Sequence, residues 1–226
     1  MNIHCCSFAS ESFAYNQKIQ AKYFYQAGFE TENMHLYNPK MLNKNFFKNQ
    51  PWASELNRFG WFSFKPLFLV SILEELKDGE ILFYLDVNDK PIVGIKNYIE
   101  VFFKKNKKID ILIPLTNYIN FRFLSKFNRE NFSLELLFSS FFNFQPEAGA
   151  LVFRNSKKCR SILWTWYYLT LTQSYEFEKY FDNRSRHDQE TLFLLSRIYK
   201  SIKLESWYFY KLTGKGLRQF IEFECF

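Results

Sequence analysis

The sequence predicts an α/β fold in which a central, mixed and mostly parallel sheet is flanked by helices. Short apolar runs alternate along the chain with stretches of helical periodicity, an order typical of parallel sheets. One of these runs, Ile81 to Leu85, is apolar at every position, as strands buried on both faces usually are. The length of 226 residues suits one domain with a substantial core.

The first elements alternate between strand and helix. We expect residues 3–8 to form a strand, residues 12–26 a helix that Gly28 ends, and residues 34–37 a second strand. Residues 38–57 are rich in Lys and Asn and poorly periodic, so irregular structure or short helices are expected there. The helix should turn four apolar side chains toward the core: Phe13, Ile19, Tyr23 and Phe24.

A lysine stands at the start of the next helix, which is expected over residues 67–76. Pro66 suits the first turn of a helix, and this places Lys65 at the N-terminal cap. A positive charge at that position opposes the helix dipole. Lys65 is therefore either fully solvated or held for an anion that the helix end also favours.

The strand over residues 81–85 leads directly into polar side chains. Asp86 follows the strand, and Asn88 and Asp89 come within three more residues. Ligands of open α/β sheets bind at the carboxyl ends of the strands. Side-chain oxygens at i and i+2 of a turn can converge on one hard cation, the usual partner of a diphosphate. The alternative is a polar turn ahead of a helix that Pro91 opens.

The second half of the chain continues the alternation. The expected elements are helix 91–103, strand 109–115, strand 150–153, helix 155–168 and helix 191–199. Asn155 or Ser156 can cap the fourth of these elements. Residues 117–144 are aromatic and expected to be partly helical. We treat residues 1–201 as the domain proper and residues 202–226, which mix aromatic and basic side chains, as a tail.

Composition narrows the classes of function. The net charge of +7 is compatible with anionic substrates, anionic lipid headgroups or nucleic acid. The four cysteines show neither metal-ligand spacing nor a disulfide framework, which favours a reducing, cytosolic environment. The N-terminus has no basic leader before an apolar stretch, and no run reaches the ~18 to 20 apolar residues of a membrane helix. We therefore expect a cytoplasmic protein that is soluble or peripheral to a membrane.

Four groups of polar residues stand out in this very apolar chain. They are Ser7 to Ser10, Lys65, Asp86 to Asp89, and Glu147 together with His187-Asp188-Gln189. Alternating β and α elements bring strand ends from distant parts of a chain to one edge of a sheet. The four groups are therefore expected to build one site.

These segments, taken in order, resemble a known family. They are Phe59-Gly60-Trp61-Phe62-Ser63-Phe64-Lys65-Pro66, then Gly79-Glu80-Ile81-Leu82-Phe83-Tyr84-Leu85-Asp86-Val87-Asn88, then Glu147-Ala148-Gly149, and last His187-Asp188-Gln189. Their order and spacing resemble those of bacterial GT-A fold glycosyltransferases that act on surface polysaccharides. The resemblance spans residues 3–199 and implies the GT-A, Rossmann-like fold of nucleotide-diphospho-sugar transferases.

The resemblance implies an enzyme that moves a hexosyl or N-acetylhexosaminyl group from a nucleotide-diphosphate donor to a hydroxyl of a growing surface glycan. The acceptor would be lipopolysaccharide or a similar lipid-linked saccharide. Mn²⁺ or Mg²⁺ would be the cofactor, and nucleic acid would not be a partner. A peripheral position on the inner face of the cytoplasmic membrane would bring the enzyme to such an acceptor.

The resemblance also implies roles for single residues. Asp86 matches the first aspartate of the family's Asp-x-Asp metal motif, and His187 matches a late histidine that completes the metal or diphosphate site. Asn88 stands at the third position of the motif, where an amide binds a cation more weakly than a carboxylate unless Asp89 turns inward. The donor would be held by Ser7, Phe8, Ala9, Ser10, Lys65, Asp86, Asn88 and Gln189.

Two carboxylates are the candidates for the catalytic group. Glu147 and Asp188 could position the acceptor hydroxyl and take its proton, as the resemblance implies. Without the resemblance, His187 or Asp188 would cap the helix that follows, and Glu147 would be an ordinary turn residue.

Three alternatives stay open. The asparagine at position 88 is compatible with a catalytically inactive GT-A domain that serves as a nucleotide-binding scaffold. The basic balance and the aromatic side chains are compatible with a nucleic-acid-binding module. The tail either packs on the domain as a final layer or holds the enzyme near a lipid-linked acceptor.

Overall fold

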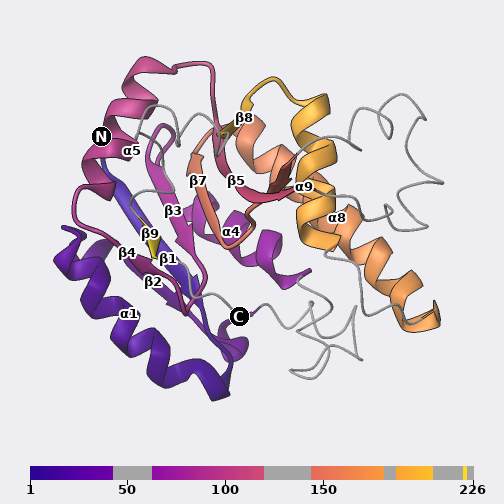
Figure 1. The fold of residues 1–226 in the computed structure, drawn as a ribbon, viewed down its shortest axis with the longest axis horizontal. Helices are drawn as coiled ribbons and strands as arrows, with labels where there is room; N and C mark the ends of the chain where they lie inside the picture. The colour runs from indigo at the N-terminus through magenta and orange to yellow at the C-terminus, as the bar shows by residue number, and fades with distance from the viewer. Residues whose placement is uncertain (43–62, 120–143, 181–186, 206–220, 223–226) are drawn as a thin grey trace.

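The computed structural model describes residues 1–42, 63–119, 144–180, 187–205 and 221–222. Within these residues a seven-stranded sheet runs in the order β2-β1-β3-β7-β5-β6, with β8 paired to β5 (Figure 1). Its strands are β1 (Ile3–Phe8), β2 (Met34–Tyr37), β3 (Ile81–Leu85), β5 (Ile111–Ile119), β6 (Phe144–Pro146), β7 (Ala150–Arg154) and β8 (Ile202–Glu205). A two-stranded sheet pairs β4 (Lys90–Pro91) with β9 (Ile221–Glu222).

The predicted mixed sheet is confirmed, with parallel and antiparallel neighbours equally frequent among its described strands, three pairs of each, rather than mostly parallel. β1 lies between two parallel neighbours, β2 and β3, and β5 runs parallel to β8. β7 runs antiparallel to β3 and β5, and β6 antiparallel to β5. The carboxyl ends of β1, β2 and β3 therefore share one edge of the sheet. Because Leu85 pairs with Ala150, the residues that follow β3 meet those that precede β7 at this edge.

Helices cover both faces of the sheet (Figure 1). α1 (Ala14–Gln26) and α5 (Ile95–Lys105) pack on one face; α4 (Phe64–Glu75), α8 (Lys157–Tyr180) and α9 (His187–Ile198) pack on the other. Odd-numbered residues of β3 join the core under α1 and α5, and even-numbered residues join the core under α4 and α8. All five β3 residues are buried, as the unbroken apolar run predicts.

α1 differs from its prediction in the residues that it buries. A short 3-10 turn over Glu11–Phe13 precedes the helix, and Phe13 is 40% exposed, so its predicted place in the core is wrong. Ile19 and Tyr23 are only partly buried. Phe24 is buried as predicted, but the second buried residue of α1 is Gln20. Gln20 is buried because its side of the helix meets the polar turn after β3.

Three other helices begin elsewhere than predicted, and one of them, α9, begins at His187 rather than at residue 191. α4 begins at Phe64, so Lys65 lies inside its first turn rather than at the cap. Pro91 does not open a helix, because it pairs in β4 with β9. α5 begins only at Ile95, after Gly94 in the left-handed conformation (φ 99°).

Parts of three predicted segments lie outside the described residues. Of residues 38–57, a 3-10 turn over Pro39–Met41 is described. Of residues 117–144, the first three extend β5 and the last begins β6. Of the tail, residues 202–205 form β8 in the main sheet and residues 221–222 form β9.

Candidate active site

The turn after β3 is held against the loop before β7. The backbone N–H of Asp86 donates to the carbonyl of Gly149 (2.7 Å), and that of Asp89 donates to the carbonyl of Asp86 (3.0 Å). The Asp86 side chain is 46% exposed, whereas Asp89 is only 8% exposed. This acidic turn, residues 86–89, therefore presents one accessible and one inward-facing carboxylate.

Lys65 is buried against Asp86. Its Nζ donates to the carbonyl of Ala148 (3.0 Å) and lies 3.4 Å from Asp86 Oδ1, and the residue is 2% exposed. The hydroxyl of Tyr84 donates to the same Asp86 oxygen, and the Tyr84 ring centre lies 5.2 Å from the ammonium. The alternative of a solvated lysine is therefore wrong. A buried ammonium requires an opposite charge and hydrogen-bond acceptors, and this site supplies both.

Three carboxylates meet around Gly149. A Cβ atom at this position would lie 3.0 Å from Asp86 Oδ2, 3.2 Å from Asp89 Oδ2 and 3.2 Å from Glu147 Oε1. Glycine fits here because a larger residue would have to displace these oxygens. Glu147 Oε1 also accepts from the N–H of Gly149 (3.3 Å). The carboxylates repel one another and favour a cation at this surface.

The donor chemistry fits a hard divalent cation that is shared with a phosphate ligand. In the described part of the chain, no group of three His, Cys, Asp or Glu side chains is placed to hold a metal ion by itself. Mg²⁺, however, is usually bound through one or two carboxylates together with substrate phosphates, and this does not require an all-protein cage. Asp86 and Asp89 supply two such carboxylates from one turn.

The side-chain oxygen of Asn88 points toward α1. Asn88 Oδ1 accepts a hydrogen bond from Asn16 Nδ2 of α1 (2.9 Å). Asp89 is the residue of this turn that faces inward, with its Oδ2 near Gly149. The two carboxylates of this turn are those of Asp86 and Asp89, at i and i+3, and Asn88 links the turn to α1.

The predicted donor segment, Ser7 to Ser10, is buried at the carboxyl end of β1. Ser7 accepts from Gln17 Nε2 through both its hydroxyl and its carbonyl (3.3 Å each), and the N–H of Ala9 donates to the carbonyl of Tyr37 (3.0 Å). The Phe8 ring packs 4.2 Å from the ring of Phe64. The register of β1 with β3 places this segment at the same sheet edge as the acidic turn.

The last predicted segment begins α9. Gln189 is 5% exposed in the first turn of this helix, and the side chains of His187 and Asp188 lie outside the described residues. α9 packs against β6, the strand that leads into Glu147. The N–H of Glu147 donates to the carbonyl of Pro114 in β5 (2.8 Å), which fixes the start of the loop.

Sequence reasoning missed several residues of this site. The apolar run over residues 81–85 predicts only a buried ring for Tyr84, although its position at i−2 places it on the same strand face as Asp86. Gln20 was missed because a glutamine in a helix normally indicates exposure. The motif Glu147-Ala148-Gly149 assigns no role to Gly149, and the need for glycine becomes visible only when the three carboxylates surround it.

Cysteines do not contribute a nucleophile within the described residues. Cys5, Cys6 and Cys159 are buried free thiols, and burial raises the pKa of each well above its ordinary value. A buried thiol stays protonated and inert. Cys225 lies outside the described residues.

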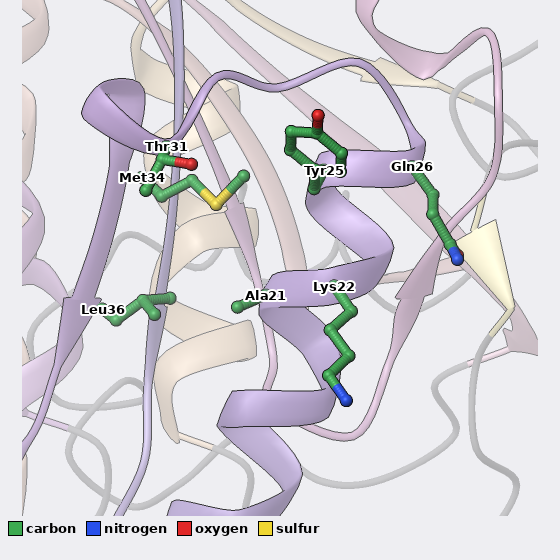
Figure 2. Close-up of a pocket in the computed structure, with 7 residues that line it drawn as sticks. All are labelled: Ala21, Lys22, Tyr25, Gln26, Thr31, Met34 and Leu36. Atoms are coloured by element: carbon green, nitrogen blue, oxygen red, sulfur yellow. The ribbon is translucent and has the colours of Figure 1, made fainter.

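A surface groove lies away from the acidic turn. It has a volume of about 510 Å³ and runs between α1 and β2. Its lining residues are Ala21, Lys22, Tyr25, Gln26, Thr31, Met34 and Leu36 (Figure 2). These residues include none of the predicted site residues. The helix positions that line the groove lie on the opposite side of α1 from Gln20.

The comparisons with known proteins support the architecture. The sequence matches no protein-family model and no curated protein. Mouse xyloside xylosyltransferase 1 in its apo form is similar in structure, with a TM-score of 0.50 and 11% identity over 91% of this chain and 85% of the other.

Two further solved structures are similar over a comparable extent. Galactosyltransferase LgtC, in complex with donor and acceptor sugar analogs, gives a TM-score of 0.51 and 12% identity over 90% of this chain and 73% of the other. A glycosyltransferase involved in glycosylation of the major capsid of PBCV-1 gives a TM-score of 0.50 and 10% identity over 92% and 84%. The chain therefore has the GT-A fold, as the motifs implied.

Proposed function

We propose that this protein is a glycosyltransferase that uses a nucleotide-diphosphate sugar as its donor. The observation that carries the proposal is the group of three carboxylates around Gly149, beside a buried lysine, at the carboxyl edge of the parallel strands. Ligands of open α/β sheets bind at this edge. The similarity in fold to solved glycosyltransferases supports the same class of reaction.

The donor side of the site is assigned to the acidic turn. Asp86 and Asp89 would hold Mn²⁺ or Mg²⁺, which when bound neutralises the charge that develops on the leaving diphosphate. Lys65 and Tyr84 bind Asp86 Oδ1, so Oδ2, which lies beside Gly149, is the oxygen that would bind the cation. The buried segment Ser7 to Ser10 and the residue Gln189 complete the proposed donor site.

The acceptor side is assigned to the loop before β7. Glu147 and Asp188 remain the candidates for the carboxylate that positions the acceptor hydroxyl and accepts its proton. The position of Glu147 Oε1, near the two donor-side carboxylates, favours Glu147. Its hydrogen bond from the N–H of Gly149 fixes the direction of this carboxylate.

The acceptor is proposed to be a surface glycan such as a lipid-linked saccharide, with a hexose or N-acetylhexosamine as the transferred sugar. This part rests on the motif resemblance and on the aromatic and basic composition of residues 202–226. Among the described helices, none combines the length and the apolar character needed to cross a membrane. The tail is the segment proposed to attach the enzyme to the inner face of the cytoplasmic membrane.

A thermal-shift panel tests the proposal. Uridine, guanosine, cytidine and thymidine diphosphates and their sugars are added with and without Mn²⁺. One nucleoside diphosphate should raise the melting temperature in a concentration-dependent way, and more so with Mn²⁺. Salt-sensitive binding of oligonucleotides without any nucleotide effect would contradict the proposal and favour a nucleic-acid-binding module.

Turnover separates an active transferase from a scaffold. The scaffold alternative rests on the asparagine at position 88, but Asp89 supplies a second carboxylate from the same turn. We therefore expect hydrolysis or transfer of the sugar nucleotide whose nucleoside diphosphate stabilises the protein. Nucleotide binding without turnover of any donor would favour the scaffold instead.

A further inference from the structure

One stripe of α1 contacts the acidic turn and the residue that follows it. Asn16, Gln20 and Tyr23, at i, i+4 and i+7, lie on the same side of the helix. Asn16 Nδ2 donates to Asn88 Oδ1 (2.9 Å), and Lys90 Nζ lies 5.5 Å from the centre of the Tyr23 ring. α1 also packs against β4, which continues directly from this turn (Figure 1).

Gln20 makes the central contact of this stripe. Its Nε2 donates to the carbonyl of Asp86 (2.6 Å) and to the carbonyl of Asp89 (2.9 Å). A side-chain amide nitrogen carries two N–H groups, so both are used. The reversed amide would point an oxygen at two carbonyl oxygens, and this determines which way the amide faces. Gln20 thus joins the first and last carbonyls of the turn.

The oxygen of the Gln20 side-chain amide lowers the stability of the folded protein. Gln20 is 2% exposed, and its Oε1 is buried without a hydrogen-bond partner among the described residues. A buried acceptor without a partner offsets much of the free energy that the two donated bonds contribute. The main consequence of a glutamine here is therefore the geometry of the turn, since its net contribution to stability is small.

We propose that Gln20 is a positioning residue that sets the separation of the Asp86 and Asp89 carboxylates. This inference rests on the proposed function, because their separation matters only to a ligand that both carboxylates bind. Mg²⁺ requires oxygens at about 2.0–2.1 Å in near-octahedral geometry, so a turn that relaxes by a few tenths of an ångström binds it less well. Gln20 acts through the turn and does not itself touch the donor.

The test compares Gln20→Met with a matched variant at the opposite edge of the sheet. Asn155 is also a buried amide whose nitrogen donates to two neighbouring carbonyls, those of Leu76 (2.8 Å) and Lys77 (3.2 Å). Asn155→Leu therefore removes the same kind of contact far from the acidic turn, together with the hydrogen bond that Asn155 Oδ1 accepts from Arg160 (2.6 Å). Each variant replaces an amide by an apolar side chain of similar size, and the melting temperature should fall in both, at least as far in Asn155→Leu as in Gln20→Met.

Mn²⁺ binding is measured on the full-length folded proteins by electron paramagnetic resonance of the free ion. The measurement is made with the nucleoside diphosphate that stabilises the wild type, and steady-state kinetics follow. Gln20→Met should weaken Mn²⁺ binding by about 10-fold or more, the effect typical of residues that orient metal ligands, and Asn155→Leu should stay within about 2-fold. Gln20→Met should also raise the KM for the donor more than it lowers kcat.

The outcomes separate this inference from the proposed function. Wild-type Mn²⁺ affinity in Gln20→Met would overturn the inference and leave the proposed function standing. Equal weakening in both variants would also overturn it, because the effect would then be one of general stability. A wild type that binds neither Mn²⁺ nor any nucleoside diphosphate would overturn both. If Gln20→Met does not fold, Gln20→Asn, which keeps the amide but shortens its reach, should show the same weakening.

Discussion

Asp86 connects a buried lysine with the exposed side of the proposed site, so its removal should have two effects. In Asp86→Ala, turnover should fall by at least about 100-fold, because a group that stabilises the developing charge of the leaving diphosphate is lost. The melting temperature should also fall, because Lys65 Nζ keeps the Ala148 carbonyl but loses the carboxylate 3.4 Å away. Donor hydrolysis and thermal unfolding are measured on the same preparation.

An aspartate at the other edge of the sheet is the control for this substitution. Asp78 is 74% exposed and pairs with Arg160 (2.8 Å). Asp78→Ala should leave turnover unchanged and alter stability little, because exposed ion pairs contribute about 0–1 kcal/mol. Unchanged turnover in a folded Asp86→Ala protein would remove Asp86 from the proposed mechanism.

Gly149 is the other residue whose substitution tests the arrangement directly. The added methyl group of Gly149→Ala would lie 3.0–3.2 Å from three carboxylate oxygens, so the acidic turn or Glu147 must move. We expect turnover to fall by about 10-fold or more, as it does when catalytic groups shift by small distances. Kinetics and a melting curve measure the two effects. A variant with wild-type turnover would show that the three carboxylates do not need their observed spacing.

At the scale of elements, β1 and β2 are joined by a pair of histidines that makes stability depend on pH. His4 Nδ1 lies 3.2 Å from His35 Nε2, and His4 Nε2 lies 3.7 Å from a carboxylate oxygen of Glu80. Burial lowers the pKa of His4 although Glu80 acts in the opposite direction, and burial together with His4 lowers the pKa of His35. Both rings therefore resist protonation in the folded protein.

The sign of the pH effect follows from these directions. The unfolded chain takes up protons at the ordinary histidine pKa of 6.5, whereas the folded chain takes them up only at lower pH. The contribution of the two neutral histidines to the free energy of unfolding is thus present above pH 6.5, the ordinary histidine pKa. It is lost as the pH falls through the lowered pKa values of the folded protein. The melting temperature should fall by a few degrees between about pH 7.5 and about pH 5.5.

His35→Gln is the variant that isolates this pair. It removes one of the two titrating groups and the repulsion between two protonated rings, so the melting temperature should depend less on pH. Differential scanning calorimetry at several pH values measures the slope. Parallel slopes in the variant and the wild type would place the acid sensitivity elsewhere in the molecule.

At the scale of the whole molecule, the tail is the segment proposed to bring the enzyme to a membrane. Lys211, Lys215 and Arg218 lie among its aromatic residues. Each basic residue near an anionic surface contributes about 1 kcal/mol, so replacing all three by Ser should weaken attachment to anionic vesicles by roughly 100-fold. Vesicle sedimentation at low salt, with neutral vesicles alongside, measures the difference.

The control for this triple substitution removes three positive charges at the end of α5 instead of in the tail. Lys105, Lys107 and Lys108 are exposed at and beyond the end of α5. Replacing these three by Ser changes the net charge equally but leaves the tail intact, so attachment should persist. Equal pelleting of the two triple variants, or no pelleting of the wild type, would contradict a membrane role for the tail.

The order of elements and the place of the site could be read from the sequence for physical reasons. An apolar run such as Ile81 to Leu85 has few alternatives to a doubly buried strand, and polar residues directly after it must leave the sheet at its carboxyl edge. Ser7 to Ser10 and the acidic turn lie at that edge as predicted. Periodicity and strand-end chemistry are local properties, so one sequence determines them.

Contacts between distant segments were decided only by the tertiary structure. Lys65 was compatible with either solvent or burial, and the packing of α4 against β3 and the Ala148 carbonyl buried it. The sequence predicts a helix that begins at Pro91, but Pro91 pairs in β4 with Ile221 of β9, 130 residues later in the chain. Gln20 and Asp89 face inward because α1 crosses the acidic turn. A side chain's burial depends on what packs over it, and that partner is set by the whole chain.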